Sequence, residues 1–200
     1  MKRKWTILVI VLLTVYMIGC LVWLMGGTAQ IKKLLSFDPE TTGVVDVIVV
    51  DHHGEDDTPH YYHIGAGRIK REAEPFEPED MAVYKVDTQG LDCYIDREKN
   101  KVLNRLRYIN IYDEQSNLVE NTLLLEAVVT QAATLEHNIM ELYIFQVGSE
   151  VFVQTELNVN WWCPCELYWY DQQNDRLVEL YTFDGLEVVG MRIRDLERAR

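Results

Sequence analysis

The chain lacks the short motifs that most often mark a catalytic site. It contains no glycine-rich phosphate loop, no G-x-S-x-G elbow, no H-E-x-x-H pair and no EF-hand loop. Serine is scarce, with three residues, and the only histidine outside residues 52–63 is His137. A Ser-His-Asp hydrolase triad cannot be assembled from these parts. These absences favour a non-enzymatic protein.

Basic residues are also few beyond the N-terminal segment. After Lys33, 14 Lys and Arg residues stand against 32 Asp and Glu residues, a formal charge of −18. Such a charge repels nucleic acid and anionic lipid headgroups, so no nucleic-acid partner is expected. It suits a soluble domain that stands away from a membrane or attracts cations or basic partners, and solubility alone is the simplest explanation.

One long apolar run is present near the start. Residues 5–25 form 21 consecutive uncharged positions, preceded by Lys2, Arg3 and Lys4. A hydrocarbon core of roughly 30 Å needs about 20 helical residues at about 1.5 Å each. We therefore expect residues 1–29 to hold a cytoplasmic stub and a transmembrane anchor over 5–25, with the lipid bilayer as a partner.

Two other interpretations of this run remain. A secretory signal cleaved after Gly27-Thr28-Ala29 normally has an apolar stretch of only about 7–15 residues. A lipoprotein signal would place the acylated cysteine at Cys20, but Leu21–Met25 stay apolar where such proteins turn polar. We favour the uncleaved, single-pass signal-anchor.

Orientation and domain limits follow from charge and composition. The three basic residues before the run outnumber Lys32 and Lys33 after it, which predicts a cytoplasmic N-terminus and an extracytoplasmic C-terminal domain. Residues 30–43 are expected to form a tether. Residues 44–200 are enough for one domain with a real core and without disulfide cross-links.

Period-two alternation dominates this domain. Val151, Val153 and Thr155 share one face of an expected strand, and Gln154 and Glu156 share the other. Gly148-Ser149 and Asp184-Gly185 are typical of hairpin turns. The pattern predicts an antiparallel meander with strands at 44–51, 60–66, 81–87, 91–96, 102–112, 140–147, 150–160, 165–171, 176–183 and 187–194.

One segment follows helical spacing instead. Between about 119 and 136, a single face collects apolar residues, with Asn117 and Glu120 as a weak capping box; these residues are Leu124, Leu125, Val128, Ala132 and Leu135. Residues 67–80, with two prolines and many acids, are expected to be a loop. The fold class is therefore α+β, mainly β, with one amphipathic helix on a sheet.

A faint repeat joins three of the expected hairpins. Asp96, Asp113 and Asp171 each follow strand residues and precede a polar turn. An Asp side chain that caps its own turn explains this pattern. The spacing is too irregular for the blades of a β-propeller, so we expect recurrent hairpins in one sheet system.

The histidines suggest a metal site. Four of the five lie within residues 51–63, together with four carboxylates. His52, His53, Asp56 and His60 are the candidate ligands for zinc or copper. If Tyr61–Ala66 is a strand, His60 and His63 point to opposite faces and cannot join one site. The spacing matches no standard zinc pattern, and a solvated hairpin loop is the simpler interpretation.

The cysteines allow a second chemistry. Cys163 and Cys165 lie on one face of an extended strand, and Cys93 lies in another predicted strand. Outside the cell a disulfide between Cys93 and either of them is allowed. Partly buried free thiols and a shared soft metal ion are the alternatives.

Aromatic residues gather near the last cysteines. Trp161, Trp162, Tyr168 and Tyr170 are candidates for a surface that stacks on cell-wall glycan or contacts another envelope protein. In strands such residues more often pack a sheet against its cover. Taken together, the residues favour a membrane-anchored, extracytoplasmic interaction domain of unknown ligand, without a cofactor. A metal-dependent protein and a glycan-binding protein are the alternatives.

Overall fold

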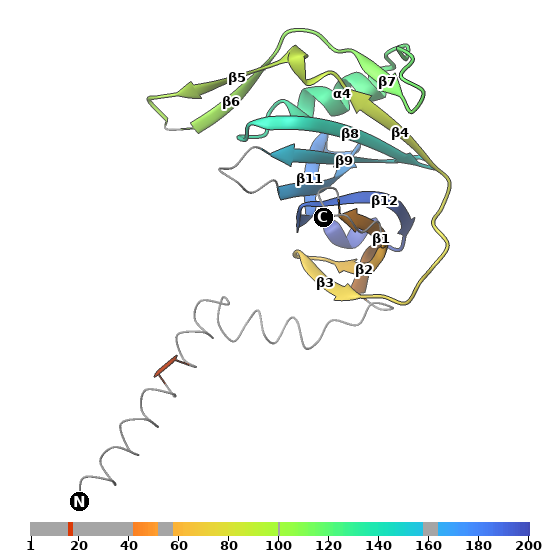
Figure 1. Cartoon of the computed structure of the whole chain (residues 1–200). Coiled ribbons are helices and arrows are strands. Elements are labelled where there is room, and N and C mark those ends of the chain that lie inside the picture. The colour runs from red at the N-terminus through yellow and green to blue at the C-terminus, as the bar shows by residue number, and fades with distance from the viewer. Residues whose placement is uncertain (1–15, 18–41, 52–57, 100, 158–163) are drawn as a thin grey trace, which may run out of the picture. The chain divides into compact units, whose positions relative to one another are not determined.

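Antiparallel pairing organises most of the described chain. The computed structural model describes residues 16–17, 42–51, 58–99, 101–157 and 164–200. The strands run as follows (Figure 1): β1 Gly43–Asp51, β2 His60–Gly65, β3 Ile69–Glu72, β4 Met81–Val86, β5 Leu91–Asp96, β6 Lys101–Leu106, β7 Ile111–Asp113, β8 Ile139–Val147, β9 Glu150–Leu157, β10 Pro164–Asp171, β11 Arg176–Asp184 and β12 Leu186–Ile193. The helices are α4, Leu123–Ala132, and the 3₁₀ turns η1, Thr88–Gly90, and η2, Leu196–Ala199.

The N-terminal segment is largely outside the described residues. Of positions 5–25 only Tyr16 and Met17 are described. Within the described part of the chain, no helix has the length and apolar character that crossing a bilayer requires. The transmembrane helix therefore stays a prediction. The chain divides into units 1–38 and 39–200, and this boundary lies inside the predicted tether.

The described strands form three sheets rather than one meander. The four-stranded sheet has the order β12-β1-β2-β3, and the six-stranded sheet has the order β11-β10-β9-β8-β4-β7. Strands β5 and β6 form a separate two-stranded hairpin. The predicted mainly-β, antiparallel class is confirmed. The single meander is wrong because β12 returns to pair with β1, and β4 inserts between β7 and β8.

The central strands β9 and β10 of the six-stranded sheet are buried on both faces. Along β10, Cys165, Leu167 and Trp169 belong to one apolar cluster. The alternate residues Tyr168 and Tyr170 belong to a second. The first cluster packs against the four-stranded sheet, and the second packs against α4 (Figure 1). The result is three layers of sheet, sheet and helix, and the alternation of strand side chains distributes the core between them.

The amphipathic helix is confirmed but shorter than predicted. It buries Leu125, Val128, Val129 and Ala132, a spacing that places one stripe on the sheet. Its N-cap is Thr122, whose hydroxyl accepts a hydrogen bond from the Leu125 N–H at 3.3 Å. The predicted Asn117–Glu120 capping box is wrong, because residues 117–119 extend alongside β7, where the Val119 N–H donates to the Ile111 carbonyl.

Two strand assignments also differ from expectation. The predicted strand 102–112 is divided into β6 and β7, which belong to different sheets, because the chain leaves the hairpin after Leu106 and pairs with β4 from Ile111. Strand β3 lies inside the predicted loop 67–80. It contains one apolar residue, Ile69, so it has no alternating pattern, and its turn uses positive φ angles at Gly67 and Arg68.

The turn chemistry is confirmed. Gly148 and Gly185 have φ angles of 60° and 63°, as hairpin turns of this kind require. The Asp113 carboxylate accepts hydrogen bonds from the Gln115 and Asn117 N–H groups at 3.0 and 2.8 Å. Asp96 caps the tip of the β5–β6 hairpin in the same way, through Glu98 and Lys99. Turns in which the first residue, an Asp, accepts hydrogen bonds from the following N–H groups therefore recur at Asp96 and Asp113, as the sequence predicted.

The helix–sheet layer gives a matched test of stability. Leu125 is 5% exposed and Leu123, two positions earlier on the same helix, is 87% exposed. Leu125→Ala should lower the free energy of unfolding by about 2–5 kcal/mol, because it leaves a cavity against the sheet. Leu123→Ala should change it by less than about 0.5 kcal/mol. Urea unfolding followed by circular dichroism measures both, and equal losses would show that α4 does not pack as described.

Candidate functional site

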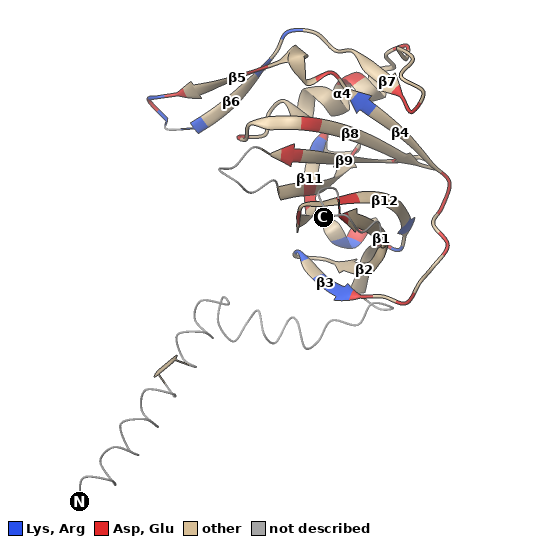
Figure 2. Cartoon of the chain, in the orientation of Figure 1, with Lys and Arg blue, Asp and Glu red and all other residues tan. Residues whose placement is uncertain are grey.

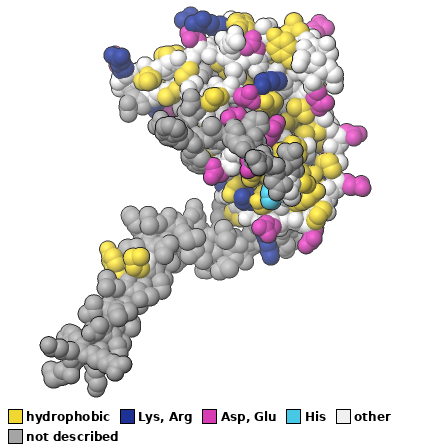
Figure 3. Space-filling model, in the orientation of Figure 1, with side chains coloured by type: hydrophobic (Ala, Val, Ile, Leu, Met, Phe, Trp, Pro, Cys, Tyr) yellow, Lys and Arg dark blue, Asp and Glu magenta, His cyan; other side chains and the backbone are white. Residues whose placement is uncertain are grey.

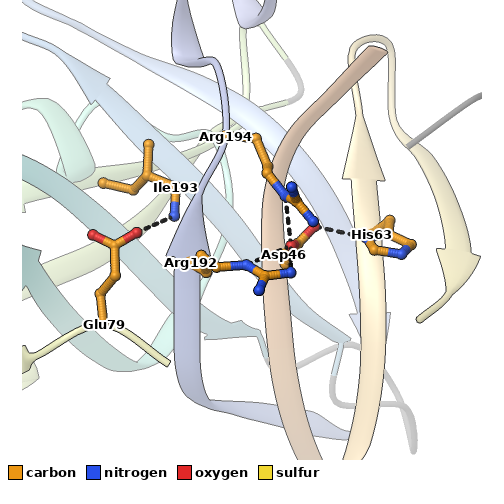
Figure 4. Close-up of polar contacts among 6 residues, drawn as sticks. All are labelled: Asp46, His63, Glu79, Arg192, Ile193 and Arg194. Atoms are coloured by element: carbon orange, nitrogen blue, oxygen red, sulfur yellow. Dashed lines mark hydrogen bonds and ion pairs between the residues drawn. The ribbon is translucent and has the colours of Figure 1, made fainter. Parts of the chain in front are cut away.

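The most concentrated polar cluster among the described residues surrounds Asp46 on β1. Its carboxylate faces away from the core, yet the residue is fully buried. One oxygen contacts His63 Nδ1 at 2.7 Å, from the neighbouring β2. The other accepts hydrogen bonds from Arg192 Nε and Nη2 at 2.9 and 2.6 Å and from Arg194 Nε at 2.7 Å (Figure 4). His63 and Arg192 are the direct cross-strand neighbours of Asp46, so register alone brings them together.

The electrostatics of this cluster oppose catalysis by Asp46. Burial by itself raises the pKa of the carboxyl group, but hydrogen bonds from His63, Arg192 and Arg194 outweigh burial. The pKa of Asp46 therefore lies below its ordinary value, and the group stays ionised. Because both oxygens are occupied by cationic or imidazole partners, the carboxylate is not positioned to take a proton from a substrate. The cluster instead joins β12, β1 and β2 into one sheet.

An acidic loop, residues 73–80, covers part of this cluster. The Phe76 ring lies 4.6 Å from the Arg192 guanidinium carbon and packs edge-on against Tyr61. Further along, the Glu79 N–H donates to the Met191 carbonyl at 2.9 Å, and the Glu79 carboxylate accepts from the Ile193 N–H at 2.8 Å (Figure 4). Strand β12 is the edge of its sheet, so the loop satisfies groups that would otherwise be exposed.

Three further buried side chains, Gln154, Tyr168 and Asp171, also have partners within the fold. Gln154 on the six-stranded sheet accepts a hydrogen bond from the Val188 N–H at 2.9 Å and so links the two large sheets. Tyr168 donates to Glu166, and burial together with this carboxylate raises the pKa of the Tyr168 hydroxyl well above its ordinary value. Asp171 accepts from Asn174 at 2.6 Å. Each of these three side chains is held by a partner within the fold.

The structure tests little of the predicted metal site. His52, His53 and Asp56 lie outside the described residues, and His60 is exposed at the start of β2. His60 stacks on Tyr62, whereas His63 contacts Asp46 on the other face. The two histidines therefore lie on opposite faces of β2. Among the residues that the structure describes, no three potential ligands are grouped for a metal ion. Zinc or copper binding by this loop stays a prediction.

The cysteines are separated by the fold. Cys93 is a free thiol on β5 and is classed as exposed. Partial desolvation, together with the nearby Asp92 carboxylate, raises the pKa of its thiol. Cys165 is buried on β10 in the six-stranded sheet. No disulfide joins these two residues, which belong to different sheets. Cys163 lies outside the described residues, so its pairing stays a prediction.

The aromatic surface predicted over residues 161–170 is wrong for the two tyrosines. Tyr168 and Tyr170 are each 4% exposed and pack in the cluster beneath α4. A ring buried in this way is not accessible for stacking on a sugar or a partner. Because β10 lies inside a sheet covered on both faces, both sets of its side chains are core residues. Trp161 and Trp162 lie outside the described residues.

The sequence analysis did not indicate one exposed apolar segment of the β-rich domain. On the β5–β6 hairpin, Tyr94 is 48% and Ile95 68% exposed, and Tyr108, just after the hairpin, is 42% exposed. The base of the hairpin is firmly placed, because Leu91 and Leu106 pack in the core beneath α4. A Cβ at Gly90 would lie 2.4 Å from the Tyr108 carbonyl oxygen, so only glycine permits this close approach.

The same hairpin is basic in an acidic molecule. Residues 91–108 carry five of the 14 Lys and Arg residues that follow the leader, and three acids. Figure 2 marks Lys and Arg positions along this hairpin, and Figure 3 shows Lys and Arg side chains at the same end of the domain. Arg97 and Arg105 make no ion pair with any described residue, whereas Arg107 pairs with Asp92 at 2.6 Å. This local excess of basic residues was the available sequence signal.

Comparisons with protein-family models, with curated proteins and with solved structures find no match to this chain.

The Asp46 cluster predicts a defined effect of pH. Because the folded pKa of Asp46 lies below its unfolded value, its contribution to stability is present above about pH 4 and is lost as pH falls further. Asp46→Asn should lower the free energy of unfolding at pH 7 by about 3 kcal/mol. This is the lower end of the range for a broken buried pair, since the arginines are partly exposed.

The matched control is Asp80→Asn, at an exposed position, which should change stability by less than about 0.5 kcal/mol. Urea unfolding of the three proteins between about pH 2.5 and pH 7 measures the effect. The difference between wild type and Asp46→Asn should shrink toward low pH. A difference that stays constant over this range would show that the Asp46 charge is not the source.

Proposed function

We propose that this chain is a single-pass membrane protein whose extracytoplasmic, β-rich domain acts by binding another protein rather than by catalysis, and that the β5–β6 hairpin makes the contact. The observation that carries the proposal is the exposure of Tyr94 and Ile95 on a basic hairpin of an otherwise acidic molecule. An exposed apolar group rimmed by polar residues is typical of a protein–protein contact.

The architecture of the hairpin supports this role. A two-stranded ribbon is marginally stable by itself, and a third strand or a covering layer normally completes it. Here β6 is attached to the body: the Asn104 amide donates to the Leu135 and His137 carbonyls, each at 2.9 Å, and Lys101 pairs with Glu136 at 2.6 Å. The hairpin is therefore held in one place while its apolar residues stay accessible. A rigid support of this kind reduces the entropy lost on binding.

The membrane part of the proposal rests on the uncharged run 5–25 and its basic N-terminal flank. The full-length protein should remain in membranes after alkaline carbonate extraction. Protease added to intact cells should remove the C-terminal domain. Replacing two residues in the middle of the run, Leu12→Lys and Leu13→Lys, should release the protein, because each charge costs about 2.5–3.5 kcal/mol at the centre of a bilayer. Release of the wild type by carbonate would contradict the anchor.

Photocrosslinking tests the hairpin. The photoreactive residue p-benzoylphenylalanine at position 95 of the full-length protein should give a covalent protein adduct in intact cells. The same residue at position 123, which is 87% exposed in the native protein, should not. Exposure alone predicts more adduct at 123, so the comparison separates binding from accessibility. Absence of an adduct at 95, or equal adducts at both positions, would overturn the proposed contact.

A further inference from the structure

The edge of β5 is exposed, and the edge toward which each residue directs its backbone N–H and carbonyl groups can be assigned. The Arg107 N–H donates to the Gly90 carbonyl at 2.8 Å, so the carbonyl at position 90 faces the β6 side of the hairpin. Antiparallel pairing alternates, and Asp92 and Tyr94 therefore bond to β6 as well. Cys93 and Ile95 direct their N–H and carbonyl groups to the other edge. Leu91 contributes only its carbonyl there, because its N–H donates to the Thr88 carbonyl at the end of η1. Among the described strands, only β6 pairs with β5.

The two edges of the hairpin differ in charge. The β6 edge carries Lys101 and Arg105, and lysine or arginine at an edge is a common means of preventing strand addition. The β5 edge presents Cys93, Tyr94 and Ile95 in succession, all exposed. Three exposed residues of this kind on an edge strand favour addition of another strand. The edge to be extended is therefore β5.

A second β5 is a suitable partner for this edge. In an antiparallel pair of identical strands related by a two-fold axis, one residue lies opposite its own copy. An axis at Tyr94 places Asp92 of each copy opposite Asp96 of the other. Like charges directly opposite each other are unfavourable. An axis at Cys93 instead places Asp92 opposite Tyr94, and Leu91 opposite Ile95. Of these two registers, charge favours the one with its axis at Cys93.

This register also matches the backbone. Leu91, Cys93 and Ile95 lie opposite Ile95, Cys93 and Leu91 of the second copy. The Cys93 pair exchanges two hydrogen bonds in the antiparallel pattern, and each Leu91–Ile95 pair makes one, from the Ile95 N–H to the Leu91 carbonyl, since the Leu91 N–H already donates to Thr88. On one face, the same residues form a continuous apolar row that covers Ile95, which is 68% exposed in the single chain. The two hairpins together form a new sheet in the order β6-β5-β5-β6, with Lys101 and Arg105 of each copy on its outer strands.

We propose that two copies of this chain associate through β5, with Cys93 on the two-fold axis, and this inference rests on the proposed function of the hairpin. The chemistry that recognises the partner is main-chain hydrogen bonding along an exposed strand edge, with the apolar row as its side-chain component. The partner is a second identical chain, and two such chains anchored in one membrane can share an axis perpendicular to it.

Thiol cross-linking of the full-length protein in membranes tests the register. The Cα atoms of a hydrogen-bonded antiparallel pair are about 5.5 Å apart, within the span of a disulfide. Diamide, as the oxidant, takes two electrons and two protons from two Cys93 thiols, so a bridged dimer should appear on a non-reducing gel. Cys93→Ser should remove this band, and Cys163→Ser should not. The double variant Cys93→Ser, Tyr94→Cys should form no bridge, because position 94 faces Asp92 of the second copy.

Light scattering of the detergent-purified protein gives an independent measurement. Ile95→Lys should weaken self-association by about tenfold or more, since it places a charge in the apolar row. Ser116→Lys, at an exposed turn away from β5, should leave it unchanged. The thermal unfolding midpoint of each variant shows whether the fold is retained. A wild-type monomer at all concentrations, or a Tyr94→Cys bridge without a Cys93 bridge, would overturn the proposal.

The adduct formed from position 95 separates this inference from the proposed function. An adduct of twice the chain mass supports both. An adduct of another mass, with no Cys93 bridge, overturns pairing with a second copy and leaves the protein-binding role standing. If no adduct forms, both proposals fail.

Discussion

Burial of the central strands of the six-stranded sheet on both faces is the constraint on which the fold depends. Every residue of β10 is buried, and β9 is buried along nearly its whole length. A sheet in this position needs two covers, and the chain supplies the four-stranded sheet on one face and α4 on the other. Each cover alone has one apolar face. Removing either would expose the apolar side chains that it covers, so the three layers stabilise one another.

The four-stranded sheet forms only when distant parts of the chain meet. Strand β12 pairs with β1 across almost the whole domain, and Asp46 connects with Arg192 and Arg194 at that junction. Hydrophobic burial does not specify which strand lies beside β1, because several strands have similar apolar faces. A buried carboxylate that needs two guanidinium partners accepts one arrangement and penalises the alternatives. The charge cluster therefore adds specificity to an apolar core that supplies most of the stability.

Local patterns predicted much of this structure from the sequence. Alternation located most strands, helical spacing located the buried stripe of α4, and turn residues located the tight hairpins. What failed depended on distance in space. The polar segment Ile69–Glu72 becomes a strand only because β2 offers an edge, and Tyr168 and Tyr170 are buried only because α4 covers them. The Asp46 cluster joins residues nearly 150 positions apart, and no local window contains it.

The exposed hairpin contrasts with the protection of other edges. The chain covers the β12 edge with Glu79 and places Lys and Arg on β3 and β6, the means by which proteins limit strand addition. On β5 the exposed residues are instead a thiol, a tyrosine and an isoleucine. Burying Ile95 and Tyr94 would recover free energy that the single chain forgoes, at about 25 cal/mol per Å² of apolar area. Because β5 is held by β6 and by a core residue at its base, association would order few additional groups, and most of that free energy remains available for binding.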